Sequence, residues 1–194
     1  MRPPSLLVLV LLLATAPRAQ ALYRAVGDTG FGLSAATTLN SDAANVVGSA
    51  ILAPAPSVDL AVSAGRSTLG RRSVTTLGVL GTYWVQRSTP TRAGLRVGAS
   101  HFDADGRTAV VVDLGAVVAR QARVSPRALV VPSLTADVLY VVSDDFASGL
   151  QTSVSAGAAL VIGGDGARAY VGPSATLNSE TNRLAFGVGG GVLF

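Results

Sequence analysis

Cysteine and lysine are both missing from this chain of 194 residues, and charge of either sign is scarce. Without cysteine the chain forms no disulfides, and it cannot be a lipoprotein acylated on a cysteine. Charged residues make up 13% of the chain, against about a quarter in soluble domains. Intrinsic disorder is also excluded, because it requires low hydrophobicity and 49% of these residues are hydrophobic. The chain must hide most of its surface or meet something other than water.

The basic residues are all arginine, and they are scattered singly along the chain. Arg71 and Arg72 form the only adjacent pair. A nucleic-acid-binding surface needs basic residues clustered on one face. We therefore expect no nucleic-acid partner.

The first 21 residues have the pattern of a secretory signal peptide. Arg2 provides a positive start, residues 5–13 an apolar core, and residues 19–21 a small-x-small cleavage site. The uncharged stretch 4–17 is too short for a membrane-spanning helix, which needs about 20 residues. We predict a signal peptide at 1–21 and a single mature domain at 22–194.

Larger apolar residues alternate with small or polar ones through most of the mature chain, which is typical of β-strands. In the last stretch Leu184, Phe186, Val188, Val192 and Phe194 share one face, while glycine and alanine make up most of the other. Merging or discarding the first two strands would leave eight. We prefer ten strands, at 31–39, 46–53, 58–69, 73–86, 92–102, 108–120, 127–142, 149–163, 167–177 and 182–194.

The predicted connections are of two alternating kinds. One kind consists of short turns rich in Pro or Gly, at 53–57, 87–91, 123–126 and 163–166. The other kind is acidic and rich in Asn, Asp and Ser, at 40–42, 103–106, 143–145 and 178–182. Residues 146–164 are uncharged, but Gly, Ser, Thr and Gln interrupt them too regularly for a membrane-spanning helix.

The less apolar face of the strands distinguishes a membrane barrel from a soluble one. A soluble β protein carries Lys, Glu, Thr and Arg on its outward face, whereas here that face is Gly, Ala, Ser and Thr with a few acids. Strands can cross hydrocarbon only as a closed barrel, because every backbone group must be paired. We therefore predict an all-β, antiparallel up-and-down transmembrane β-barrel, with a soluble secreted β-barrel as an alternative.

The signal peptide and the final strand give the chain a family resemblance. A terminal Phe194, preceded at alternate positions by Phe186, Val188 and Val192, resembles the signal by which assembly machinery recognises small bacterial outer-membrane β-barrels. The chain resembles the OmpA/OmpX-like barrel domains of that group. The resemblance implies a Gram-negative bacterium, export through the signal peptide, and outer-membrane lipid and the barrel-assembly machinery as partners.

The resemblance also implies an orientation, with the C-terminus in the periplasm. The Pro and Gly turns then lie on the periplasmic side and the acidic loops outside. These outer loops are short, which departs from the family's pattern and argues against a large extracellular binding surface. Five of the ten aromatic residues fall near predicted strand ends and are candidate interface anchors, namely Tyr83, Trp84, Phe102, Tyr140 and Tyr170.

Four charged residues, Asp59, Arg96, Asp113 and Asp137, fall on predicted inward faces. Folding the strand 92–102 back onto 108–120 pairs position 96 with about position 114, which makes Arg96 and Asp113 neighbours. A charge inside a narrow barrel needs a partner or water. The four residues are predicted to form a lumen polar network, either as a structural ion pair or as a polar constriction.

His101 is the only histidine, next to Ser100 and two residues from Asp103. Neighbours on a strand point to opposite faces, so Ser100 and His101 cannot act as nucleophile and base. We predict no catalytic residue, and the chain shows no residue pattern typical of a metal or cofactor site. The predicted function is a non-enzymatic envelope component or a binder of a small apolar or amphipathic ligand. The alternative is a barrel enzyme that hydrolyses lipid or peptide.

Overall fold

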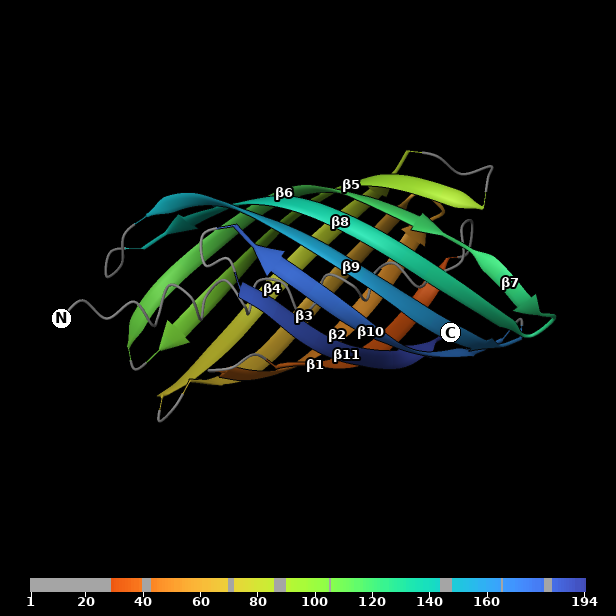
Figure 1. Cartoon of the computed structure of the whole chain (residues 1–194), viewed down its shortest axis with the longest axis horizontal. Helices are drawn as coiled ribbons and strands as arrows, with labels where there is room; N and C mark the ends of the chain where they lie inside the picture. Colours follow the sequence, from red (N-terminus) through yellow and green to blue (C-terminus); the bar gives the residue numbers. More distant parts are fainter. Residues whose placement is uncertain are drawn as a thin grey trace.

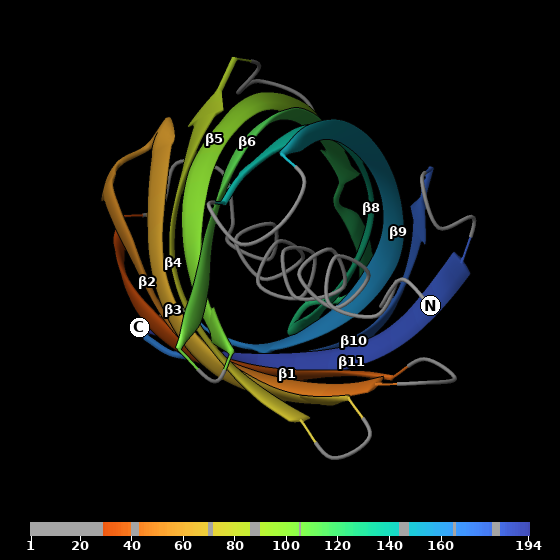
Figure 2. The same ribbon diagram turned by 90° about the vertical axis from the view of Figure 1, so that its left-hand side faces the viewer.

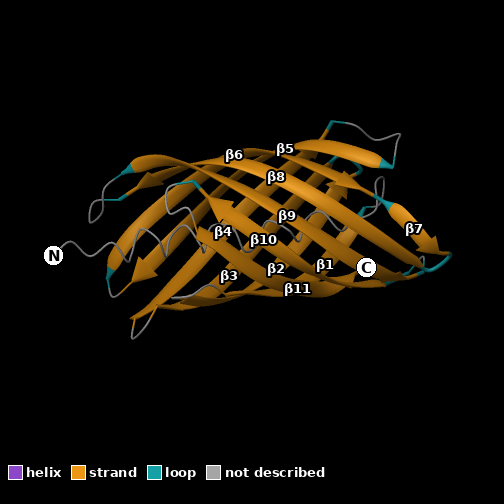
Figure 3. Ribbon diagram, in the orientation of Figure 1, coloured by secondary structure: helices purple, strands orange, loops and turns teal. Residues whose placement is uncertain are grey.

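The computed structural model describes residues 29–39, 43–69, 72–85, 90–104, 106–143, 148–164, 166–179 and 183–194. The predicted signal peptide lies outside these residues. All regular elements in these ranges are β-strands (Figure 3), and no helix there is long and apolar enough to cross a membrane. The strands are β1 (Gly30–Leu39), β2 (Ala43–Ala55), β3 (Val58–Leu69), β4 (Arg72–Trp84), β5 (Thr91–Ala104), β6 (Arg107–Arg120), β7 (Ala122–Ser125), β8 (Ala128–Val142), β9 (Gly149–Gly163), β10 (Arg168–Asn178) and β11 (Arg183–Leu193).

The strands form one closed antiparallel sheet, seen as a ring in Figure 2. Consecutive strands pair with one another except β6 and β7, β1 pairs with β11, and β6 pairs with β8. The short β7 also pairs with β8, so it continues β6 along the same partner. The barrel therefore has ten strands, which confirms the predicted fold class and strand number. Closure leaves no unpaired sheet edge along the barrel wall, as crossing a bilayer requires.

The main departure from the predicted strands is β7. Residues 123–126 were expected to form a turn, but Ala122–Ser125 are a strand and the turn lies at Pro126 and Arg127. The physical reason is the length of β8, whose first residues offer hydrogen-bonding partners beyond the end of β6. The resulting hairpin reaches beyond the neighbouring strands at one end of the barrel (Figure 1).

Each strand presents one face to the outside and one to the interior, because successive side chains alternate. On β6 the side chains of Val112 and Leu114 are exposed, whereas those of Val111 and Asp113 are buried. The same alternation runs through the other long strands and surrounds the barrel with exposed Val, Leu, Ile and Phe side chains. Such a belt is unfavourable in water and suits hydrocarbon.

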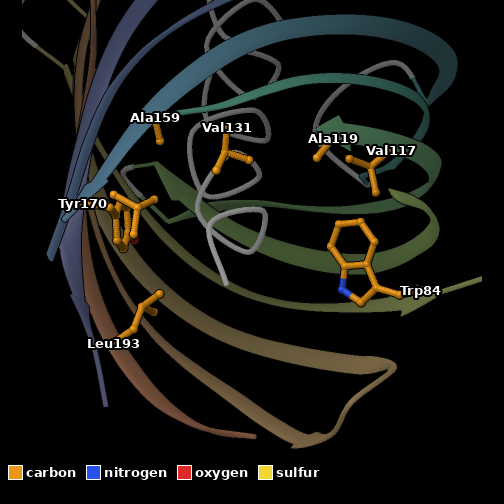
Figure 4. Packing of buried hydrophobic residues seen from close by; sticks show 8 residues of the cluster. Trp84, Val117, Ala119, Val131, Ala159, Tyr170 and Leu193 are labelled. Atoms are coloured by element: carbon orange, nitrogen blue, oxygen red, sulfur yellow. The ribbon is translucent and has the colours of Figure 1, made fainter. Parts of the chain in front are cut away.

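Part of the inner wall is apolar (Figure 4). It comprises eight buried residues near the barrel end that holds the C-terminus, namely Trp84, Val117, Ala119, Val131, Ala159, Val161, Tyr170 and Leu193.

The expected role of three aromatic residues as interface anchors is therefore wrong. Trp84, Phe102 and Tyr170 are buried on the inner wall, whereas Tyr83 and Tyr140 are exposed on the outside. Strand alternation explains the difference, since Trp84 must face inward if its neighbour Tyr83 faces outward.

Candidate functional site

The four charged residues predicted to face the interior all do so. Asp59 on β3, Arg96 on β5, Asp113 on β6 and Asp137 on β8 are buried, with Arg96 only 1% exposed. Their strands lie in one continuous part of the barrel, in the order β3, β4, β5, β6 and β8. The residues therefore share one part of the inner wall, which we call the charged wall.

The register of the strands places three of these residues in one lateral row. Asp59 lies opposite Thr82, Thr82 opposite Arg96, Arg96 opposite Gly115, and Gly115 opposite Asp137. Only one small residue therefore separates Arg96 from an aspartate on either side. Cross-strand neighbours on the same face of a sheet lie close enough to interact.

Arg96 and Asp113 are diagonal neighbours across β5 and β6, and the expected register was one residue off. Asp113 lies opposite Gly98 rather than next to position 96. A two-residue connection between β5 and β6 sets this register, with Gly106 at a φ of 80°. A left-handed residue of this kind is typical of tight hairpin turns.

Two glycines make room for the carboxylates on the charged wall. A β-carbon added at Gly98 would lie 2.6 Å from Oδ2 of Asp113. A β-carbon added at Gly115 would collide with Oδ1 of Asp137 and with the carbonyl oxygen of Ala136. The carboxylate of Asp113 therefore lies over Gly98 on β5, and the carboxylate of Asp137 lies over Gly115 on β6. This places them toward the strand that carries Arg96, where opposite charges stabilise one another.

Trp84 and Arg92 also belong to the charged wall, and the sequence analysis did not include them in the polar network. The indole Nε1 of Trp84 donates a 2.7 Å hydrogen bond to Oδ2 of Asp59. The guanidinium of Arg92 lies 5.3 Å from the centroid of the Trp84 ring, a cation–π geometry. Alternation along the strands could have placed both side chains inside. Arg92 lies four residues before Arg96 on β5, and Trp84 lies two residues after Thr82 on β4.

Outside the charged wall and the apolar cluster, the inner wall carries small polar residues. The hydroxyls of Ser155 and Thr176 lie 2.8 Å apart on β9 and β10. The hydroxyl of Ser67 on β3 donates a 2.9 Å hydrogen bond to Oδ1 of Asn45 on β2. Away from the barrel rims, β1, β2, β9, β10 and β11 carry no Asp, Glu or Arg at a described inward position. Charge inside the barrel is thus confined to the strands from β3 to β8.

His101 lies on the outer surface, near the end of β5. It stands opposite Leu77 on β4 and Val110 on β6, both of which are exposed apolar residues. Ser100 occupies the other face of the strand, and its hydroxyl lies near Gly78. Asp103 shares the outward face with His101, and Thr75 and Thr108 lie opposite Asp103 on the neighbouring strands. Within the described part of the chain, no three His, Asp or Glu residues lie together as a metal site would require.

The residues of the predicted assembly signal lie on the outer face of the closing strand. Phe186, Val188 and Phe194 are exposed, and Val192 shares their face. β11 pairs with β10 on one side and β1 on the other. Backbone hydrogen bonds in both directions between Phe31 and Phe194 complete the closure. The recognition of this strand by assembly machinery stays a prediction.

No protein-family model and no curated protein sequence matches this chain. Solved structures do match in fold. The β domain of the Bordetella autotransporter BrkA gives a TM-score of 0.53 at 9% identity, covering 85% of this chain and 98% of that one. The translocator domain of the autotransporter NalP from Neisseria meningitidis gives 0.52 at 10% identity, covering 91% of each chain.

A third match is a bacterial polysaccharide outer-membrane secretin, with a TM-score of 0.52 at 8% identity over 85% of this chain. The chain spans only 64% of that protein's length. At these identities the matches concern the fold alone. The narrower resemblance to OmpA/OmpX-like domains stays a prediction. The chain therefore has the fold of the β-barrels found in bacterial outer membranes.

Proposed function

We propose that this chain is a small non-enzymatic β-barrel of the bacterial outer membrane that serves as a structural component of the envelope. The observation that carries the proposal is the division of the strands into two faces. The outer face is apolar around the barrel, and the charged residues between the barrel rims lie inside. This distribution is the reverse of that in a soluble protein and matches a barrel surrounded by lipid.

The route to the membrane is part of the proposal. A signal peptide at 1–21 would direct export, and the closing strand would present Phe186, Val188, Val192 and Phe194 to the barrel-assembly machinery. The exposure of these side chains on one face of β11 supports such a contact. Deletion of Phe194 is expected to lower the amount of barrel in the membrane, whereas a soluble secreted protein would tolerate it.

The location of His101 supports a non-enzymatic role. A hydrolase that acts through a nucleophilic side chain needs a base beside it, and His101 stands between two apolar neighbours on the outer surface. We expect His101→Ala to leave folding and cell phenotype unchanged. Loss of a lipid- or peptide-hydrolysing activity in this variant would favour the enzyme alternative.

A second candidate function, binding of a small amphipathic ligand, is favoured by one observation. Trp84 belongs both to the apolar cluster of the inner wall and to the charged wall, through Asp59 and Arg92. A ligand with an apolar body and a polar head would match this boundary. Native mass spectrometry of the purified barrel tests the idea, because a retained small molecule should be lost in Trp84→Ala.

The proposed function is tested by expressing the chain with its signal in a Gram-negative host and isolating outer membranes. Folded barrels migrate differently on SDS gels before and after boiling. We expect the protein in the outer-membrane fraction, with a mobility shift on boiling. A soluble protein without a shift would contradict the proposal and support the secreted alternative.

A further inference from the structure

The hairpin formed by the end of β6, β7 and the start of β8 carries three exposed arginines. Arg120 ends β6, Arg123 lies in β7, and Arg127 lies in the turn that leads to β8. We call these three residues the basic hairpin. Figure 1 shows this hairpin extending past the neighbouring strands at the barrel end that holds the C-terminus.

A fourth arginine lies beside the basic hairpin. The backbone nitrogen of Gly163 donates a 3.0 Å hydrogen bond to the carbonyl oxygen of Arg127, which ties the end of β9 to the hairpin turn. Arg168 lies opposite Gly163 at the start of β10. Its Nε donates to the carbonyl oxygen of Gly164 at 3.4 Å. The positive charge therefore extends from the hairpin to the adjacent turn.

No outward acidic side chain balances this charge among the described residues of the same barrel end. The one acidic side chain described there is Asp59, which faces the interior and accepts the Trp84 hydrogen bond. The exposed charged side chains described at this end are therefore Arg120, Arg123 and Arg127, and all three are positive. A cationic surface attracts anions within about 10 Å at ordinary ionic strength.

The outward residues of β6 show where this surface meets the membrane. Between Thr108 and Arg120 every outward side chain is apolar, and Val110 to Val118 form the belt on this strand. A strand tilted by about 40° advances about 2.6 Å per residue along the membrane normal, so these twelve steps cover about 30 Å. The apolar band of outer-membrane barrels is about 25 Å tall, so this span covers the band and reaches the interface on each side. Arg120 is therefore placed at the boundary of this band.

The opposite boundary has a different composition. Thr108 lies opposite Asp103, Asp103 opposite Thr75, and Thr75 opposite Arg66, so that one lateral row ends the belt there. Arg66 donates from Nε to the Ser73 hydroxyl at 2.6 Å. This row contains both signs of charge and several hydroxyls. The two membrane boundaries thus differ, because the exposed charged side chains described at the basic hairpin are all positive.

We propose that the basic hairpin binds the phosphate groups of anionic phospholipids in the leaflet next to it. Arginine suits this role because its guanidinium binds phosphate oxygens in a bidentate manner. The inference rests on the proposed membrane location. It goes beyond that location because it names a lipid class and the residues that select it.

Continuity with the apolar belt favours lipid over an acidic peptide as the partner. Arg120 lies on the same outward face as the belt residues of β6, one step beyond Val118. Arg123 follows three residues later, about 8 Å further along the normal. The headgroup layer on each side of the hydrocarbon is itself about 5 to 8 Å thick. Both arginines therefore reach the height of the lipid phosphates, with Arg120 on the outward face of the hairpin and Arg123, three positions later, on its other face, where it is exposed beyond the barrel rim.

The test compares two matched variants of the full folded chain by native mass spectrometry. The variant R123Q/R127Q removes two charges from the basic hairpin, and R66Q/R107Q removes two charges near the other barrel end. Each protein is incubated with phosphatidylglycerol or phosphatidylcholine of identical acyl chains. We expect the unchanged chain and R66Q/R107Q to retain phosphatidylglycerol preferentially. R123Q/R127Q should lose much of that preference, with about a fivefold decrease for each guanidinium.

Further variants show whether the lipid preference depends on positive charge alone. R120Q/R123Q/R127Q should bind both lipids equally, whereas R120K/R123K/R127K should keep a preference that falls as salt increases. Equal retention of the two lipids by the unchanged chain would overturn the inference, as would an unchanged preference in R120Q/R123Q/R127Q. Arginine-dependent binding of a polyglutamate peptide without any lipid preference would overturn it in favour of a protein partner.

The mobility shift on boiling is measured for every variant in the same experiment. If the chain forms no barrel at all, the proposed function fails. If every variant forms the barrel and the lipid preference does not follow the arginines, only the lipid inference fails. The two failures are therefore distinguishable.

Discussion

The two parts of the inner wall carry different kinds of polar side chain. The strands from β3 to β8 carry every described inward charge away from the barrel rims, with Arg96 at the centre of a row of aspartates. The strands from β9 through β11 to β2 use hydroxyls and amides instead, such as the Ser155 and Thr176 pair. Both parts have the same apolar outer face. The requirement for lipid compatibility therefore determines only one side of each strand.

The difference indicates where sequence change should be most costly. A charged wall depends on several partners at once, since removing one leaves the others buried and uncompensated. A hydroxyl pair depends on two small groups, and a hydrogen bond between neutral groups contributes about 1 kcal/mol. We therefore expect a gradient of effects across the inner wall.

The largest effect is expected for Arg96→Leu. This change leaves Asp113 and Asp137 without the neighbouring guanidinium, and breaking a buried ion pair costs about 3 to 5 kcal/mol. Urea unfolding of the barrel in liposomes, followed by the mobility shift, measures the loss. The combined variant R96L/D113N/D137N should recover most of the stability because it removes the uncompensated charges. Equal stability of Arg96→Leu and the unchanged chain would show that the charged wall does not act as a unit.

A smaller effect is expected for Gly115→Ala. The added β-carbon would displace the carboxylate of Asp137 from the space opposite Arg96. Overpacking of this kind costs about 1 to 3 kcal/mol. Gly149→Ala is the matched control, since a β-carbon there would meet nothing within 4 Å. If the two variants unfold at the same urea concentration, the glycine does not serve to accommodate the carboxylate.

Asp59→Asn should weaken the link between the charged wall and the apolar cluster. The hydrogen bond from Trp84 would lose its ionised acceptor, and we expect a loss of about 1 kcal/mol. The chain contains one Trp, so its fluorescence reports on this contact directly. We expect a shifted emission maximum for Asp59→Asn and none for Asp137→Asn. Identical spectra for the unchanged chain and Asp59→Asn would contradict a hydrogen bond between Trp84 and Asp59.

The smallest effect is expected for Thr176→Val, on the uncharged part of the wall. The change removes the partner of the Ser155 hydroxyl, at a cost of about 1 kcal/mol. The combined variant S155A/T176V removes both hydroxyls and should be closer to the unchanged chain. A loss as large as that of Arg96→Leu would abolish the distinction between the two parts of the wall.

Alternation along the sequence was enough to predict the strands and their faces. Successive side chains on a strand point to opposite faces. This rule alone was enough to place four charged residues inside, namely Asp59, Arg96, Asp113 and Asp137. The same rule places Trp84 inside, and it was misassigned because aromatic residues near strand ends commonly anchor barrels at the membrane interface. The residue type of Trp84 was given more weight than its position in the strand, although the position is the stronger constraint.

Register and strand continuation were harder to predict. The pairing of Arg96 with Gly115 depends on the two-residue turn at Gly106, and alternation does not reveal whether a loop has two residues or four. The short β7 was missed because Pro126 marks a turn, while the pairing that keeps the preceding residues extended comes from β8. This pairing is local, with partners three to eight residues apart, so the error was to begin the turn at Arg123 rather than at Pro126.

The orientation of the two faces is the central claim, and cysteine scanning tests it most directly because the chain has no native cysteine. Leu114 on β6 is exposed, whereas Leu139 on β8 is buried and faces the interior. A fluorophore on the single cysteine of Leu114→Cys should be strongly quenched by nitroxide groups attached to lipid acyl chains. The same label on Leu139→Cys should be quenched much less. Equal quenching, or the reverse order, would contradict a barrel that faces lipid with its apolar side.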